Sequence, residues 1–210
     1  MVAVEIPPRG MLRYPTMEAT TAHSHHHHEP LPTSGRALDQ VALSATLHCL
    51  TGCAIGEIVG VAIGTALGWS NLATIVLAIA LAFVFGYSLT SLPLLRAGLA
   101  LAVVIPIAFA SDTLSIATME LVDNAIILLI PGAMEAGLGD LLFWGSLAAA
   151  LVIAGVAAFP VNRWLLRRGK GHAAVHDTGV HGGPSPRVVG IIVVLAAVFG
   201  ATVLIAEALG

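Results

Sequence analysis

The chain has 210 residues, of which 57% are hydrophobic and only 10% carry a charge, and its net charge is −3. A soluble domain has about 45–50% apolar and about 25% charged residues, so this composition excludes an ordinary soluble protein and predicts an integral membrane protein. No basic arm and no interleaving of basic and aromatic residues suggests a nucleic-acid partner, and we expect none. We expect an all-α, polytopic transmembrane bundle whose main partner is the lipid bilayer.

The first segment, residues 1–37, is rich in proline and histidine and lacks the apolar stretch of a secretory signal peptide. We expect it to be disordered. Its histidine tract is interrupted and internal, which favours a native feature over an affinity tag; it consists of His23, His25, His26, His27 and His28. Histidine-rich tracts bind transition metals weakly, so this segment is a candidate collector of metal ions.

Apolar stretches long enough to cross the hydrocarbon follow this segment. We predict spans at about 41–67, 72–90, 111–130, 141–164 and 188–208, with Asn71 as the N-cap of the second. Residues 94–131 are too long for one span, and we interpret Pro106 and the Ser111–Asp112 step as dividing off an interfacial or packed-in helix at about 94–109. The predicted organisation is a helical core at 38–170, a His/Gly/Pro linker at 171–187 and a C-terminal transmembrane helix at 188–210.

Lysine and arginine in the loops predict the orientation of the chain. The basic residues fall on one side of the membrane if residues 94–109 do not cross it on their own; they are Arg9, Arg13, Arg36, Arg96, Arg163, Arg167, Arg168, Lys170 and Arg187. This pattern predicts a cytoplasmic N-terminus.

Polar residues recur at helical spacing inside the first span. His48 begins a row at four-residue intervals that continues with Gly52, Gly56, Gly60 and Gly64. Such a row of glycines forms a groove in which another helix packs closely, within one chain or between subunits. The adjacent row holds Cys49, Cys53 and Glu57, and an intrahelical disulfide at this spacing would be strained, so we expect free thiols.

A second polar stripe lies in the third span and contains Asp112, Met119, Glu120, Asp123 and Asn124. A charged side chain at the bilayer centre costs roughly 2.5–3.5 kcal/mol, and such residues usually face the bundle interior and mark an ion pathway. We therefore expect this stripe to pack against the polar row of the first span. Asn124 and Asn162 fit interhelical hydrogen bonds better than ligands.

The combined residues fit a transition-metal site. Thiolate, thioether and imidazole favour Cu(I) or Zn(II), so His48, Cys49, Cys53 and Met119 are the predicted ligands of a copper or zinc ion. The acidic residues Glu57, Asp112, Glu120 and Asp123, with Asn124, would neutralise its charge or carry protons. His172, His176 and His181 form a second, loosely spaced histidine group. The alternative is structural: buried cysteines behave as small hydrophobes, and a buried carboxylate persists when protonated.

Several longer stretches carry a family resemblance. HCLTGCAIGE, FVFGYSLT, ASDTLSIATMELVDNAIILLIPGAM and FWGSLAAALVIAGVAAFPVNRWLLRRGKGH resemble the bacterial domain-of-unknown-function family 4396 over residues 44–172. The resemblance implies a small helical bundle of the bacterial inner membrane and no established activity. Members of that family are often described beside copper-handling proteins, an association that favours copper.

Three functions follow from these patterns. The first is binding and translocation of a transition-metal ion, with copper favoured and zinc possible. The second is a proton or cation channel or exchanger in which the thiols are structural, and the third is a non-transporting accessory subunit of a membrane complex. We expect no enzymatic activity, because no nucleophile–base pair or nucleotide-binding loop is evident. A homo-oligomer would provide more room for a central pathway.

Overall fold

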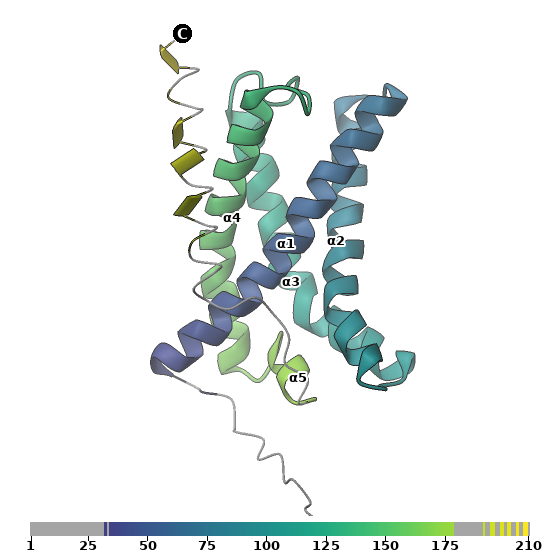
Figure 1. Cartoon of the computed structure of the whole chain (residues 1–210). Helices are drawn as coiled ribbons and strands as arrows, with labels where there is room; N and C mark the ends of the chain where they lie inside the picture. Colours follow the sequence, from purple (N-terminus) through teal and green to yellow (C-terminus); the bar gives the residue numbers. More distant parts are fainter. Residues whose placement is uncertain are drawn as a thin grey trace, which may run out of the picture.

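The computed structural model describes residue 32, residues 34–178 and scattered positions between 191 and 209. The continuous part consists of helices and connecting turns without a strand (Figure 1): α1 (Gly35–Leu67), α2 (Asn71–Arg96), α3 (Leu101–Leu129), α4 (Leu141–Arg167) and α5 (Ala173–His176). Four of these helices are long and apolar enough to cross a membrane, which confirms the all-α transmembrane bundle. The predicted span at 188–208 and the tract 23–28 lie outside the continuously described residues.

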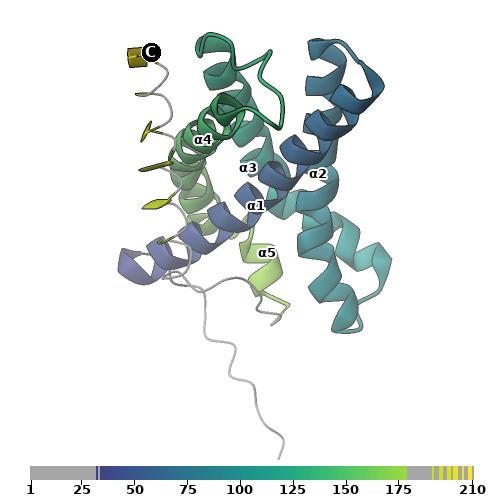
Figure 2. The ribbon, with the colours of Figure 1, turned by 45° about the horizontal axis from the view of Figure 1, so that its top comes forward.

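Helix α1 runs obliquely across the bundle, with its N-terminal half beside α4 and its C-terminal half beside α2 (Figure 2). The N-terminus of α1, the turn between α2 and α3, and α5 lie at one end of the bundle (Figure 1). The turn between α1 and α2 and the loop between α3 and α4 lie at the other end. Helices α1 and α3 therefore run in the same direction, so that residues at similar depth on the two helices face each other.

The glycine row of α1 lies against α2 in an antiparallel register. A Cβ atom at Gly52 would lie 2.7 Å from Cα of Gly86, and one at Gly60 would lie 2.5 Å from Cα of Ala78. These distances are shorter than any ordinary contact, so the two backbones meet at a separation that only glycine permits. The row ends at His48, whose Nε2 lies 2.8 Å from Oγ1 of Thr90 on α2.

The boundaries predicted for residues 91–131 are wrong. Helix α2 continues through Pro93 to Arg96, and residues 101–129 form one uninterrupted helix that contains Pro106. The turn between them is at Gly98, whose φ of 89° is in the left-handed region. Membrane helices tolerate proline because neighbouring groups satisfy the freed carbonyl, so neither proline ends its helix. The N-cap of α2 is also Ser70 rather than Asn71, since the Ser70 hydroxyl accepts a 3.4 Å hydrogen bond from the amide of Ala73.

Polar contacts of α4 hold three helices together beside the centre of the bundle. Nδ2 of Asn162 donates hydrogen bonds to Oγ1 of Thr46 on α1 and Oγ of Ser115 on α3, at 3.0 and 2.9 Å. Asn162 therefore makes interhelical hydrogen bonds, as predicted. Next to it, Nε of Arg163 lies 2.6 Å from Oδ1 of Asp39, which ties the N-terminal end of α1 to α4.

Candidate metal centre

Buried and half-buried polar or sulfur-containing side chains lie in a line along α1 and α3, which we call the polar file. From the end of the bundle near α5 to the opposite end, it comprises His172, His48, Asp112, Cys49, Cys53, Met119, Glu120, Asp123 and Glu57. On α3 the file extends over 11 residues from Asp112 to Asp123, about 17 Å at 1.5 Å per residue. It thus crosses about half of the roughly 30 Å hydrocarbon layer.

The first part of the file is a group of two imidazoles and one carboxylate, which we call the His–Asp–His station. One ligand atom each of His48, Asp112 and His172 lies within 4.8 Å of the other two. Nε2 of His172 is 3.5 Å from Oδ1 of Asp112, and the two imidazole rings pack edge to face with centroids 5.3 Å apart. Thr90 orients the His48 ring, as outer-shell partners do for metal-binding histidines.

His172 reaches this station because the chain turns back sharply after α4. Gly169 and Gly171 both have a φ of 64°, in the left-handed region, and Ala173 is fully buried against Leu38 of α1 and Leu166 of α4. Burial and the neighbouring His48 lower the pKa of His172 to about 3. The imidazole is therefore neutral at physiological pH, and both its nitrogens are buried without a hydrogen-bond partner. A neutral imidazole whose nitrogens have no hydrogen-bond partner in the protein can bind a metal ion.

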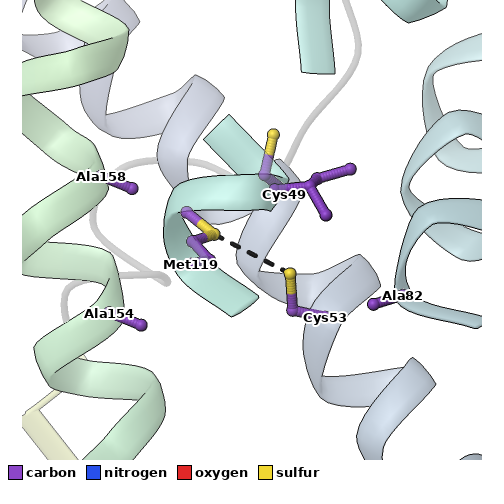
Figure 3. Packing of buried hydrophobic residues seen from close by; sticks show 7 residues of the cluster. Cys49, Cys53, Ala82, Met119, Ala154 and Ala158 are labelled. Carbon is purple, nitrogen blue, oxygen red and sulfur yellow. Dashed lines mark hydrogen bonds between the residues drawn. The ribbon is translucent and has the colours of Figure 1, made fainter. Parts of the chain in front are cut away.

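Sulfur atoms form the next part of the file. Sγ of Cys49 lies 3.8 Å from Oδ1 of Asp112, which connects this part to the His–Asp–His station. One turn further along α1, Sγ of Cys53 lies 4.0 Å from Sδ of Met119, a pair that we call the sulfur station (Figure 3). Both cysteines are free and buried, as predicted. Small residues from α2 and α4 surround the sulfur atoms, with Ala82, Ala154 and Ala158 in the same cluster.

Three acidic residues complete the file, and we call them the carboxylate triad. Glu120 and Asp123 on α3 are 4% and 2% exposed, and none of their four carboxyl oxygens has a hydrogen-bond partner. Glu57 on α1 lies within electrostatic range of both. Its Oε1 is also buried and unpartnered. A buried charged carboxylate without a partner is costly, so each of these groups is either protonated or next to a cation.

A cavity opens at each end of the polar file. The larger one has a volume of about 350 Å³, is lined by Glu57, Asn124 and Glu135 among other residues, and lies between the ends of α1, α2, α3 and α4. The smaller one, of about 40 Å³, is lined by His48, Thr90 and His172. The file therefore connects two hollows at opposite ends of the bundle.

The structure divides the predicted ligand set into two parts. His48 faces Thr90, Asp112 and His172, whereas Cys53 and Met119 face each other, and Cys49 lies between the two groups. The predicted interhelical hydrogen bond of Asn124 is wrong, since its Nδ2 donates a 2.9 Å hydrogen bond to the carbonyl oxygen of Glu120 within α3. His176 is not one of the three residues of the station.

Sequence reasoning missed the part played by His172. It treated this residue as one of a loose group in a loop outside the membrane. The signal that was available is the sequence Gly169-Lys170-Gly171-His172, in which two glycines permit the tight return of the chain.

A family model described as a domain of unknown function, DUF4396, matches residues 40–171. This match confirms the resemblance found in the sequence. It contains the whole polar file except His172, which directly follows the last matched position. No curated protein and no solved structure matches the chain.

Proposed function

Since this chain belongs to the DUF4396 family, whose description assigns no activity, we propose from the polar file alone that the protein binds a transition-metal ion and carries it across the membrane. The observation that carries the proposal is the continuity of the file. Buried nitrogen, oxygen and sulfur ligands follow one another from the small cavity to the large one, and many of their polar atoms lack a protein partner. In a purely structural network, we would expect each buried polar atom to have a hydrogen-bond partner within the protein.

Copper is the ion that the ligands favour. The His–Asp–His station, with the Cys49 thiol beside it, offers ligands that suit both copper and zinc. The sulfur station adds a thioether, which is a ligand of Cu(I) rather than of zinc. Copper is therefore the ion that finds an acceptable ligand at both stations, and zinc is the alternative cargo.

We further propose that the protein lies in the bacterial inner membrane with its N-terminus in the cytoplasm. The basic residues near the helix ends gather at the end of the bundle that carries α5; they are Arg36, Arg96, Arg163, Arg167, Arg168 and Lys170. The opposite end carries Glu135 and Asp140 in the loop between α3 and α4. This distribution follows the positive-inside rule, and it makes the His–Asp–His station the cytoplasmic end of the file.

Elemental analysis of detergent-purified protein tests the proposal. Residues 23–28 are deleted to remove the histidine tract, and the protein is loaded with Cu(I) or Zn(II). We expect about one ion per chain, and loss of that ion when Cys49 and Cys53 are both replaced by serine. Proteoliposomes then test transport, with accumulation of copper in the lumen as the readout. Absence of metal above background after loading would refute the proposal.

The carboxylate triad supports a second candidate, a proton or cation channel or exchanger. In that case Glu120→Gln would stop flux, whereas the serine variants of Cys49 and Cys53 would remain active. A third candidate, an accessory subunit that docks through its glycine groove, loses its main support because α2 of the same chain fills that groove at Gly52 and Gly60.

A further inference from the structure

An apolar groove lies between the N-terminal half of α1 and α4, and it shares no residue with the polar file. Its volume is about 490 Å³, and its walls are apolar side chains of both helices: Leu43, Leu47, Leu50, Val152, Val156 and Phe159. Val156 is 69% exposed, so the groove opens toward the surroundings of the bundle. It is deepened at Gly155, where a Cβ atom would lie 3.6 Å from Cδ2 of Leu50. The proposed metal pathway does not account for this surface.

The charged residues of the groove lie at the end where α1 begins. Arg36 and Gln40 are both exposed and are one turn apart on α1, so they lie on one helical face. Asp39 also lines this end, but its Oδ1 accepts a 2.6 Å hydrogen bond from Nε of Arg163, and these two charges offset each other. Arg36 forms no ion pair with any residue that the structure describes. The groove therefore ends in one uncompensated positive charge.

The length of the groove matches one leaflet of a membrane. Arg36 and Leu50 are 14 residues apart on α1, about 21 Å at 1.5 Å per residue. One leaflet with its headgroup region is about 20–22 Å thick, half of the roughly 40–45 Å bilayer. Arg36 lies at the end of α1 and Leu50 near its middle. The groove thus runs from the membrane surface toward the midplane, with its charge at the surface and its apolar walls below.

A phosphate group fits the charged end of the groove. A guanidinium group binds phosphate through two parallel hydrogen bonds, and the Gln40 amide beside Arg36 is a further donor. An apolar helix packed in the groove would cover its walls but would leave the charge of Arg36 without a partner. Arg167, one turn beyond Arg163 on α4, adds positive charge at the same end. The surplus of positive charge favours a headgroup with a net negative charge over a zwitterionic one, whose ammonium group would be repelled.

We propose that the groove is a binding site for one anionic phospholipid. The phosphate contacts Arg36 and Gln40, and an acyl chain lies along the apolar walls between α1 and α4. The lipid fills the space left at Gly155 and so holds the N-terminal half of α1 against α4. This inference goes beyond the proposed function and does not depend on it, because no residue of the groove is a candidate metal ligand.

Native mass spectrometry of the full chain in detergent, titrated with phosphatidylglycerol or phosphatidylcholine, tests this site. For the wild type we expect one phosphatidylglycerol per chain, bound at least fivefold more tightly than phosphatidylcholine. Arg36→Gln is expected to reduce the affinity for phosphatidylglycerol to that for phosphatidylcholine. The matched control is Arg96→Gln, which changes an exposed arginine at the same end of the bundle that does not line the groove. We expect this control to bind both lipids within twofold of the wild type.

A second variant tests the position of the acyl chain. Gly155→Leu places a side chain in the groove and is expected to weaken the binding of both lipids at least fivefold, and unchanged binding in this variant would overturn the groove as the site. Arg36→Gln changes an exposed residue outside the packed core, so it carries the test even if Gly155→Leu does not fold. Equal affinities of the wild type for the two lipids, or equal losses in Arg36→Gln and Arg96→Gln, would overturn a specific anionic site. Absence of bound lipid from the full chain would also overturn it, and would leave the segment 188–208 or a second copy of the chain as the occupant.

Discussion

Replacement of His172 by alanine removes one of the three proposed ligands of the His–Asp–His station without changing a transmembrane helix. The residue precedes α5, and the anchoring of this segment rests on Ala173, which is fully buried against α1 and α4. We therefore expect the variant to fold. The Asp112 carboxylate would lose its 3.5 Å contact with Nε2 of His172, and only His48 and Asp112 would remain at the station.

The expected loss of metal affinity depends on whether a variant removes a ligand or only a residue that supports a ligand. Loss of an outer-shell partner typically weakens metal binding about 10–100-fold. Thr90, which lies 2.8 Å from Nε2 of His48, is such a partner, so Thr90→Val is expected in this range. Loss of the ligand itself costs more, and we expect His172→Ala to weaken binding more than about 100-fold, or more than about 2.8 kcal/mol.

Competition with a chromophoric Cu(I) chelator measures these affinities, in protein that lacks residues 23–28. His176→Ala is the matched control, because it changes the same residue type in the short helix that directly follows His172 and is not part of the station. We expect this control to bind within threefold of the wild type. An equal loss in His172→Ala and His176→Ala, or a loss below tenfold in His172→Ala, would refute the assignment of His172 as a ligand.

Three other predictions concern the remaining parts of the bundle. The variant with Cys53→Ser and Met119→Leu should bind Cu(I) at least tenfold more weakly and Zn(II) less than threefold more weakly than the wild type. The same chelator competition measures both affinities. Equal losses for both ions would contradict a copper-selective sulfur station. Gly60→Ala should destabilise the bundle by about 1–3 kcal/mol in denaturant unfolding because of overpacking against α2, whereas Gly139→Ala, which has open space around it, should change little. Asn162→Leu should cost about 1–3 kcal/mol, since two interhelical hydrogen bonds of about 0.6–1.7 kcal/mol each are lost, and an unchanged unfolding curve would show that these bonds contribute nothing.

The membrane class and the helical spans could be predicted from sequence because they depend on local composition. A helix that crosses lipid must satisfy its backbone internally and present apolar side chains, and both requirements act on consecutive residues. The rows on α1 were also visible, since residues four apart lie on one helical face. The helix boundaries in residues 91–131 were predicted wrongly because of two prolines. Pro93 and Pro106 would break a helix in water more readily than in a bundle whose neighbours compensate for a lost hydrogen bond.

The position of His172 could not be predicted from periodicity. It depends on the return of a short segment across the end of the bundle, and so on the left-handed conformations of Gly169 and Gly171 and the burial of Ala173. These are tertiary features that no helical pattern records. The division of the candidate ligands between two stations could not be predicted from periodicity either. It depends on how far α1 and α3 are shifted along each other, because this shift decides which side chains face one another.

The glycine row and the ligands of α1 are parts of one arrangement. His48 and Gly52 are one turn apart in the same row, and their partners Thr90 and Gly86 are one turn apart on α2. The close approach of the two backbones at Gly52 therefore brings the Thr90 hydroxyl to 2.8 Å from the His48 ring. A larger residue at Gly52 would move α2 outward and release that ring, although it touches no ligand. Helix spacing and the orientation of the candidate ligands are thus controlled by the same row of α1, so residues without metal-binding atoms contribute to the proposed metal centre.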